Sequence, residues 1–531
     1  MSHEAKGPDS QGPPPPLAPP RGPFAALMAS GMVGTESNEP PAVAETHISV
    51  VFFVGDHVYK VKKPLDLGFL DFRTREVREA VCKREVELNS RLAPDVYLGV
   101  VDLVGPDGAP FDHLVVMRRM PSERRLSTLV TSGQDVRAEL HSIAQTLVEF
   151  HAHADTSKEI AEAGTIDAIR TNWENNSDQL RSLVGSLNDR RAELDSDIVD
   201  SIASLAQRYI AGRSGLFNRR IAEGKVRDCH GDVLADDIFC LADGPRILDC
   251  IEFDDRLRYG DVLGDVAFLA MDLERLGAPT LGADLLEDYR NLAGDSYPAT
   301  LADFWIAYRA QVRAKVAALR LAQGDPGASA EADRLLKMAL AHLKRCQLKL
   351  VLIGGAPGTG KSTLAKELAE RQGWILIRSD EIRKGLVGLS PTDRSGATGK
   401  IEEGIYDQAT TQATYENMLT QARTALGDGT SVVLDASWND AHLRALAAAV
   451  AADTSSDLIE LCCEAPLDVT IKRVEMRSAR NDDASDASTE VLEALRHRSP
   501  WPSATVIDTT WTLEDSMTQL MNMIDREVLG T

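Results

Sequence analysis

The sequence predicts two folded domains in series, an α+β domain followed by an α/β domain built on a parallel sheet. In the first part, strand-like segments separated by short turns come before a long helical stretch, which is typical of the α+β class. In the second part, short apolar strands alternate with amphipathic helices, and this alternation favours a parallel sheet. The chain has 531 residues, enough for two or three domains with separate cores.

The composition indicates a soluble globular protein, because 43% of the residues are hydrophobic. No segment approaches the roughly 20 apolar residues that cross a membrane, and the proline-rich start has no secretory apolar region. We therefore expect a cytoplasmic protein without a membrane partner. The seven cysteines are an odd number without a C-x-x-C pair, so the sequence predicts neither a disulfide framework nor a zinc site.

The charge argues against nucleic acid as a partner. The formal net charge is −23, which repels a polyanion unless a local basic groove overrides it. Between Asp482 and Glu493 there are five acidic residues and no Lys or Arg. We therefore expect a small-molecule partner, neutral or cationic, rather than nucleic acid.

The first domain follows a proline-rich segment, residues 1–43, that predicts a disordered tail. Strand patterns at 48–54 and 57–62 flank Gly55-Asp56, which predicts a hairpin with a two-residue turn. Lys60 and Lys62 point to one face of the second strand because side chains alternate along a strand.

A helix is expected next, from about Arg73 to Leu92. Glu85 falls in phase with its apolar stripe, which consists of Val77, Val81, Leu88 and Leu92. An unpaired buried charge is very costly, so a carboxylate on this stripe needs a partner, and Lys60 or Lys62 is the obvious one. The alternative is that Glu85 is partly exposed and both lysines are solvated.

Carboxylates gather between residues 227 and 254. Asp232, in His230-Gly231-Asp232, is followed five residues later by Asp237. A short apolar strand then carries three more candidates, Asp249, Glu252 and Asp254. This order is that of protein-kinase-like phosphotransferases, in which the first Asp deprotonates the acceptor hydroxyl and the later oxygens hold the metals that bridge the phosphates.

With Gly260-Asp261 and Asp265-Val266-Ala267 farther on, residues 45–325 resemble the aminoglycoside phosphotransferase and fructosamine-kinase-like group. The resemblance implies a protein-kinase-like bilobal domain at residues 44–325. It also implies that Lys60 binds phosphate with Glu85 as its partner, and that Asp232 is the catalytic base.

The same resemblance implies two Mg²⁺ ligands in this domain. One is Asp237, which stands where the family usually has Asn. The other is one of Asp249, Glu252 and Asp254, and Glu252 is preferred because Ile-Glu-Phe echoes the family's Ile-Asp-Phe. The domain should end on a helix from Phe304 to Gln323, followed by a linker helix within residues 326–346.

The second domain is organised around a strand, a glycine-rich turn and a helix between Leu348 and Glu370. The turn has the P-loop spacing G-x-x-x-x-G-K-S, in which backbone N–H groups wrap the phosphates, the Lys reaches the β and γ oxygens, and the Ser holds Mg²⁺. The predicted ATP-binding residues are Gly355, Gly358, Gly360, Lys361, Ser362 and Thr363, and Ser362 is also a predicted metal ligand.

Two later strands of this domain lead into aspartates, at Asp380 and Asp435. Ligands of parallel sheets bind beyond the carboxyl ends of the strands, and Asp435 stands where a P-loop enzyme places a Mg²⁺-linked carboxylate. Arg473 and Arg477 share one face of a later helix. They predict either a solvated charged face or a lid whose arginines neutralise the transferred phosphoryl group.

Residues 347–531 resemble P-loop small-substrate kinases of the gluconate kinase, chloramphenicol phosphotransferase, zeta-toxin and polynucleotide 5′-kinase type. The resemblance implies that Asp380 takes the proton of the acceptor hydroxyl, that Arg383 helps bind the acceptor, and that Arg473 and Arg477 hold ATP. The whole chain resembles bacterial proteins in which an aminoglycoside-phosphotransferase-like domain is fused to an AAA-type or zeta-toxin-like ATP-binding domain.

The patterns together predict an ATP- and Mg²⁺-dependent phosphotransferase with two nucleotide sites and a small polar acceptor. The alternative is a regulatory protein in which one domain senses nucleotide and the other only hydrolyses ATP. A plain ATPase needs no base at the acceptor position, so Asp232 and Asp380 favour transfer. Aminoglycoside resistance has weak support, because a fold does not fix the acceptor.

Overall fold

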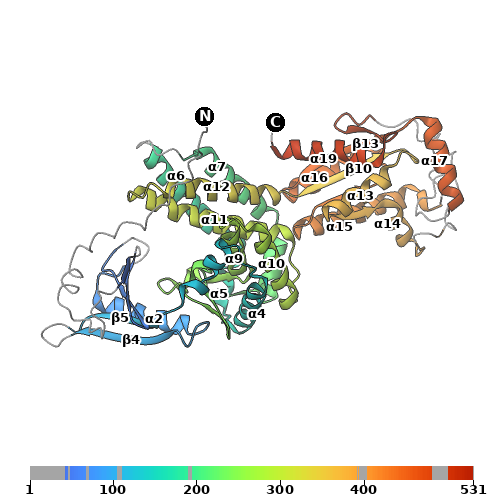
Figure 1. Cartoon of the computed structure of the whole chain (residues 1–531). Coiled ribbons are helices and arrows are strands. Elements are labelled where there is room, and N and C mark those ends of the chain that lie inside the picture. Colours follow the sequence, from blue (N-terminus) through green and yellow to red (C-terminus); the bar gives the residue numbers. More distant parts are fainter. Residues whose placement is uncertain are drawn as a thin grey trace, which may run out of the picture. The chain divides into compact units, whose positions relative to one another are not determined.

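The structure, a computed structural model, describes residues 42–45, 48–66, 71–104, 110–188, 194–390, 393, 404–480 and 500–529. The chain divides into two compact units, Met1–Val86 with Asp95–Arg119 and Glu87–Pro94 with Met120–Thr531. The first is the strand-rich part of the first predicted domain, and the second holds the helical part together with the P-loop domain (Figure 1). The predicted domain boundaries stay predictions. Residues 1–41 of the tail and the acidic run at 482–493 lie outside the described residues.

The first unit is built on an antiparallel sheet with the strand order β1-β2-β3-β5-β4. The hairpin of β2 and β3 turns at Gly55, whose φ of 55° suits a two-residue turn, and this confirms the predicted hairpin. The strands are β1 (Ala42–Glu45), β2 (Ser49–Val54), β3 (His57–Lys62), β4 (Tyr97–Val104) and β5 (Pro110–Arg118).

The predicted helix after the hairpin is α2 (Arg75–Asn89). Its predicted apolar stripe is wrong at Val77, which is 40% exposed. The first turn is held instead by a buried ion pair, in which Arg78 Nε lies 3.0 Å from Asp112 Oδ1 on β5. The buried apolar face begins one turn later, at Cys82, and continues to Leu88.

The second unit begins with a mainly helical lobe whose apolar side chains form two clusters. One joins α6, α7, α11 and α12, and the other joins α4, α9, α10 and the small hairpin β7–β8. The elements are η1 (Ser122–Arg124), α3 (Leu126–Thr131), α4 (Arg137–His153), α5 (Lys158–Glu162), α6 (Ile166–Asn188), α7 (Ser196–Ala211), α8 (Ser214–Ala222), β6 (Val226–Asp228), η2 (Ala235–Asp237), β7 (Ile238–Leu241), β8 (Gly244–Ile247), η3 (Asp255–Leu257), β9 (Tyr259–Asp261), α9 (Leu263–Arg275), α10 (Pro279–Ala293), α11 (Ala299–Ala322) and α12 (Ala328–Arg345).

The predicted linker helix, α12, is part of this lobe. It begins at Ala328, inside the segment expected to be a linker, and packs along α11 and α7. Leu336 and Leu343 are almost fully buried in the cluster that also contains Phe304 and Trp305 of α11. The helix therefore completes the core of the helical lobe.

The P-loop domain has a parallel sheet with the strand order β11-β12-β10-β13-β14. One face of the sheet packs against α15 and α16, and the other packs against α13 and α19 (Figure 1). The elements are β10 (Lys349–Gly355), α13 (Lys361–Gln372), β11 (Ile375–Arg378), α14 (Ser379–Leu386), η4 (Gly404–Tyr406), α15 (Gln408–Gly427), β12 (Val432–Asp435), α16 (Ala441–Asp453), β13 (Asp457–Glu464), α17 (Leu467–Arg480), β14 (Thr505–Asp508) and α19 (Leu513–Leu529).

Two predictions from composition can be compared with these elements. Among the described residues, no helix is long and apolar enough to cross a membrane. All seven cysteines are buried and none forms a disulfide, as expected from their odd number and spacing.

Candidate active sites

In the first unit, Glu85 pairs with both lysines of β3. Its Oε1 lies 2.9 Å from Lys60 Nζ and its Oε2 lies 2.6 Å from Lys62 Nζ. The side chains of Lys62 and Glu85 are fully buried, and that of Lys60 is 11% exposed. The predicted pairing is therefore confirmed, and it joins α2 to β3 through two charge-assisted contacts.

The catalytic loop predicted at His230-Gly231-Asp232 follows β6 and is held from α9. The buried carboxylate of Asp265 accepts the backbone N–H of His230 at 2.7 Å and that of Gly231 at 2.9 Å. Gly231 has a φ of +89°, and a Cβ there would lie 3.1 Å from Ile251 Cδ1. Only glycine fits this tight turn without strain, and the turn fixes where Asp232 begins.

Three buried groups, His151, Cys229 and Asp265, lie behind this loop. His151, Cys229 and Asp265 come within 4.8 Å of one another. Burial raises the pKa of Asp265, but the hydrogen bond from His151 together with the nearby His151, His230 and Arg309 side chains outweighs this effect and leaves the pKa low. Burial raises the pKa of the Cys229 thiol well above its usual value, which keeps it protonated. His151 lies between the Tyr289 hydroxyl and Asp265, and the Cys229 thiol donates to the carbonyl of Gly260, so each of these side chains has a partner within the protein.

Asp232 keeps part of its surface exposed, but the protein packed around its carboxyl raises its pKa to about 6. Arg313 and Arg309 oppose this rise, whereas Asp249 adds to it. Asp249 therefore lies close enough to Asp232 to influence its protonation. A carboxylate with a pKa near neutrality is suited to take a proton from a hydroxyl.

The predicted metal ligands lie at the base of the β7–β8 hairpin. Asp237 directly precedes β7, and its carbonyl accepts the N–H of Leu248 at 3.0 Å. Asp249, which follows Leu248, has a left-handed backbone with a φ of +64°. Such a conformation costs energy in a residue other than glycine and is often found at functional sites.

The other two candidates on this strand differ from Asp249. Glu252 is buried, with 8% of its surface exposed. Asp254 caps the short helix η3 and accepts Nη2 of Arg256 at 2.8 Å. The structure thus gives Asp254 a local structural role, and sequence pattern alone did not reveal the strained backbone of Asp249.

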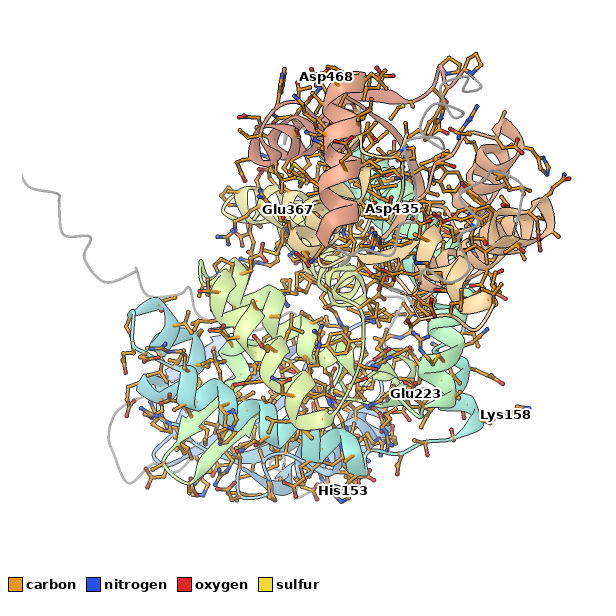
Figure 2. The ribbon with its side chains drawn as sticks, turned by 90° about the vertical axis from the view of Figure 1, so that its right-hand side faces the viewer. His153, Lys158, Glu223, Glu367, Asp435 and Asp468 are labelled. Carbon is orange, nitrogen blue, oxygen red and sulfur yellow. The ribbon has the colours of Figure 1, made fainter. Side chains whose placement is uncertain are left out.

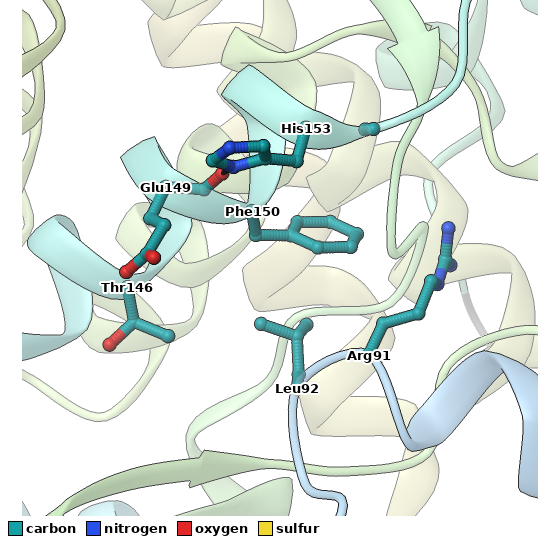
Figure 3. A pocket seen from close by; sticks show the side chains of 7 residues that line it. Arg91, Leu92, Thr146, Glu149, Phe150 and His153 are labelled. Carbon is teal, nitrogen blue, oxygen red and sulfur yellow. Dashed lines mark hydrogen bonds between the residues drawn. The ribbon is translucent and has the colours of Figure 1, made fainter.

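A separate cavity of about 390 Å³ lies beside α4, lined by Arg91, Leu92, Thr146, Glu149, Phe150, His153 and Ala154 (Figure 3). Arg91 stacks over the ring of Phe150, 5.0 Å from its centroid. Its guanidinium also donates to Asp228 and to the carbonyl of Cys229, just before the catalytic loop. Asp232, Asp237 and Asp249 are not among the lining residues, so this cavity is not the catalytic site.

In the P-loop domain, the predicted glycine turn connects β10 to α13. Gly358 and Gly360 have φ values of +79° and +86°. A Cβ on Gly358 would lie 2.5 Å from the carbonyl oxygen of Thr470, and one on Gly355 would lie 2.8 Å from that of Cys463. Glycine is therefore required at these positions by backbone conformation and by space, which agrees with a loop that wraps phosphates.

Asp435 lies at the carboxyl end of β12, in the domain that also contains Glu367 of α13, and both are labelled in Figure 2. Ile353 of β10 pairs with Asp435 in the sheet register. Burial raises the pKa of Asp435, and Lys361, the Ser362 hydroxyl and Arg378 oppose that rise. The structure therefore brings together three predicted residues, Lys361, Ser362 and Asp435.

The predicted base, Asp380, lies in the first turn of α14 and adds its negative charge to the surroundings of Asp435. Arg383, one turn later, places Nη1 3.2 Å from Asp380 Oδ1 and stacks over Tyr406, 4.7 Å from the ring centroid. Asp380 and Arg383 are thus neighbours, as expected if both face an acceptor.

Arg473 does not form a solvated face. Its guanidinium donates to the carbonyl of Thr509 at 2.7 Å and reaches the carbonyl of Gly358 at 3.5 Å, so it ties α17 to the glycine turn. The side chain of Arg477 lies outside the described part of the chain. The role of Arg477 as an ATP ligand stays a prediction.

Known proteins resemble both halves of the chain. Residues 69–304 match the family model described as phosphotransferase enzyme family, and residues 350–502 match the one described as AAA domain. Uncharacterized protein Rv2004c of Mycobacterium tuberculosis is 43% identical over 478 residues, which cover 90% of this chain and 94% of the relative. The chain belongs to the same protein family as this relative. Uncharacterized protein Mb2027c of Mycobacterium bovis matches with the same identity and coverage.

Solved structures resemble each half of this family member separately. The GDP and kanamycin complex of APH(2")-IIia has 16% identity and a TM-score of 0.38, covering 60% of this chain and 98% of that one. A gluconokinase from Sinorhizobium meliloti 1021 has 14% identity and a TM-score of 0.25, covering 34% and 97%. Likenesses at this level carry no information about the acceptor. The family matches bear out the predicted resemblance and fold class, a kinase-like domain followed by a parallel-sheet P-loop domain, and support ATP-dependent phosphoryl transfer in general.

Proposed function

We propose that this protein transfers the γ-phosphoryl group of ATP to hydroxyl groups of small polar metabolites, with one Mg²⁺·ATP site in each domain. One observation carries the proposal. In each half, the candidate base lies near a second carboxylate: the charge of Asp249 helps to raise the pKa of Asp232, and the charge of Asp380 helps to raise the pKa of Asp435. Hydrolysis needs only a positioned water, whereas transfer to a hydroxyl benefits from a base in this position.

In the P-loop domain, the residues present fit a metal ion. Asp435 is 4% exposed, and its Oδ1 is buried without a hydrogen-bond partner among the described residues. A buried carboxylate oxygen is costly unless a cation or donor reaches it. We assign the metal to Ser362 and Asp435, where Mg²⁺ would neutralise charge on the phosphates. Lys361 binds the phosphate oxygens, and Asp380 takes the acceptor proton.

In the kinase-like domain, we assign the metal to Asp237 and Asp249, and we keep Glu252 as the competing ligand. The strained backbone of Asp249 and its electrostatic effect on Asp232 favour it. Lys60, oriented by Glu85, binds phosphate, and Asp232 takes the acceptor proton. The variants Asp249→Asn and Glu252→Gln separate the two assignments, because only loss of the true ligand raises the Mg²⁺ concentration needed for nucleotide binding.

The proposed function is tested by measuring ATP consumption against a panel of sugars, amino sugars, sugar acids, sugar phosphates and nucleosides. Full-length wild type is compared with Asp232→Asn and Asp380→Asn. An acceptor whose turnover is lost only in Asp232→Asn is assigned to the kinase-like domain. An acceptor whose turnover is lost only in Asp380→Asn is assigned to the P-loop domain. ATP hydrolysis that no acceptor changes in any of the three proteins contradicts the proposal and favours the regulatory ATPase.

A further inference from the structure

Two arginines on α11, Arg309 and Arg313, lie one helical turn apart and face the catalytic loop. Arg309 Nη1 donates to the carbonyl of Gly231 at 3.1 Å, and its Nε donates to the carbonyl of Gly264 at 3.2 Å. Its guanidinium also lies 4.7 Å from the ring centroid of Phe268. Arg309 is thus held by two backbone carbonyls and by the ring of Phe268. Its hydrogen bond to Gly231 connects α11 to the loop that carries Asp232.

Arg313 differs from Arg309 because no hydrogen bond to the backbone and no contact with an aromatic ring is found for it among the described residues. It makes no ion pair or hydrogen bond with the residues that the structure describes, and its Nε is buried without a partner. Among the charged groups around Asp232, it has the largest effect on that carboxyl. Arg313 is therefore a partly buried cation near the catalytic Asp232, without a direct ion pair or hydrogen bond to any described residue.

The chain has 81 acidic and 58 basic residues, and other arginines near this site are paired with carboxylates. Farther along the same helix, Arg320 lies 2.6 Å from Asp325 and 3.0 Å from Glu331. Arg275 of α9 likewise pairs with Asp272 at 2.6 Å. Arg213, which is buried without a carboxylate, donates instead to the carbonyls of Gly212 and Thr454 at 2.8 Å. Arg313 has neither kind of partner among the described residues, which leaves it able to bind an anion that the chain does not supply.

The energetic reason is the cost of burying a polar group. A buried guanidinium N–H without an acceptor loses its hydration and gains nothing in return, whereas a bound anion restores the hydrogen bond with opposite charge. Arginine is suited to this role because its planar fork matches the two oxygens of a carboxylate or phosphate.

We propose that the acceptor of the kinase-like domain carries an anionic group, a carboxylate or a phosphate, in addition to its reactive hydroxyl, and that Arg313 binds this group. The inference rests on the proposed function and specifies its substrate class. It differs from the neutral or cationic acceptor that the net charge of the whole chain predicts, because salt screens distant surface charges, whereas Arg313 would contact the acceptor directly.

The reaction remains ordinary phosphoryl transfer. The acceptor hydroxyl oxygen forms a bond to the γ-phosphorus as the bond from that phosphorus to the β–γ bridging oxygen breaks. The hydroxyl proton passes to the carboxylate of Asp232, and ADP leaves. Arg313 holds the anionic group of the acceptor and thereby orients the hydroxyl toward Asp232, so it is a substrate-binding residue and takes no proton.

The test uses the full-length Lys361→Ala protein, in which the second domain is silenced. A bacterial metabolite extract is separated on anion- and cation-exchange resins, and each fraction is assayed for ATP consumption that requires Asp232. The acceptor should be retained on the anion exchanger. If treatment with phosphatase then abolishes its activity, the anionic group is a phosphate; if activity survives, it is a carboxylate.

The active fraction also tests the role of Arg313. Arg313→Gln should raise the KM for that fraction about 10- to 100-fold, the loss expected for a hydrogen bond to a charged group, and leave the KM for ATP unchanged. The matched control is Arg320→Gln on the same helix, which should change neither constant.

Three outcomes contradict the inference. An acceptor that passes through the anion exchanger or binds the cation exchanger is not anionic. An Arg313→Gln protein in which only the KM for ATP rises shows that the arginine contacts the nucleotide. If no fraction supports Asp232-dependent turnover, the proposed function of this domain fails, and the inference fails with it.

Discussion

The lysines predicted to bind phosphate are held in opposite ways in the two domains. Lys60 and its neighbour Lys62 pair with Glu85 at 2.9 and 2.6 Å, and the Glu85 side chain is fully buried. Lys361 is half-buried and has no ion pair within 4.0 Å among the described residues. Lys60 is thus part of a buried charge cluster that stabilises the fold. Lys361 has no comparable contact in the described part of the chain and is not expected to contribute to stability.

The two loops that hold the candidate catalytic and phosphate-binding residues also differ in what fixes their conformation. The P-loop takes its shape from its own glycines, because Gly358 and Gly360 supply the left-handed backbone locally. The catalytic loop of the first domain takes its shape from elsewhere, since Asp265 on α9 accepts two of its backbone N–H groups. Loss of Glu85 or Asp265 in the first domain should therefore disturb stability and activity together, and loss of the Lys361 side chain in the P-loop should disturb activity alone.

The largest expected effect concerns Glu85. Its replacement by Ala leaves Lys60 and Lys62 buried without a counter-charge, and it should lower the free energy of unfolding by about 3–5 kcal/mol. Urea denaturation at neutral pH measures this. The matched control is Glu79→Ala on the same helix, which removes an exposed pair with Lys83 and should change stability by less than about 0.5 kcal/mol. Equal small changes in both variants contradict the structural role of Glu85.

The Lys361→Ala variant tests the expectation that this lysine acts in catalysis and not in stability. Loss of a cation at the transferred phosphoryl group should lower ATP turnover by the P-loop domain about 100- to 1000-fold, by analogy with other preorganised charge stabilisers. The melting temperature should stay unchanged, because no described ion pair is lost. The measurement is acceptor-dependent ATP consumption in the Asp232→Asn background, together with a thermal melt. A lower melting temperature with unchanged turnover would show that Lys361 stabilises the fold and does not act in catalysis.

Asp265→Asn tests whether the catalytic loop depends on a distant residue. The amide can accept fewer of the hydrogen bonds that the carboxylate accepts from His230 and Gly231, so stability should fall by about 1–3 kcal/mol. Turnover that requires Asp232 should fall as well, while turnover that requires Asp380 stays unchanged. The control Asp254→Asn removes a contact with the exposed Arg256 and should have little effect on stability.

The smallest effect concerns pH. Burial raises the pKa of Asp232 to about 6, and the base must be deprotonated to act. In the Asp380→Asn protein, kcat/KM for the acceptor should therefore be constant above pH 7 and fall about tenfold per pH unit below pH 6. A profile that stays flat to pH 4.5 would mean that Asp232 is an ordinary carboxylate or is not the base.

The sequence predicted best what is encoded over short distances. The hairpin at Gly55, the glycine turn from Gly355 to Ser362 and the paired charge of Glu85 all follow from local periodicity and backbone chemistry. Sequence motifs also predicted that Asp435 would face the P-loop, because the carboxyl ends of parallel strands meet at one edge of a sheet.

The sequence could not predict what depends on contacts between distant segments. The exposure of Val77 follows from an ion pair between Arg78 and Asp112, which are 34 residues apart. The positive φ of Asp249 has no local signature, since the residue is not glycine. Arg309 and Arg313 show a spacing of four on one helix, but only the folded chain reveals that this face meets the catalytic loop.

The central claim, two nucleotide sites of unrelated fold in one chain, is tested most directly by counting them. Calorimetric titration of the full-length protein with a non-hydrolysable ATP analogue and Mg²⁺ should give two sites per chain. The same titration of Lys361→Ala should give one, because the kinase-like domain keeps its site. A wild-type protein with one site that is lost in Lys361→Ala would contradict the account and leave the first domain without nucleotide.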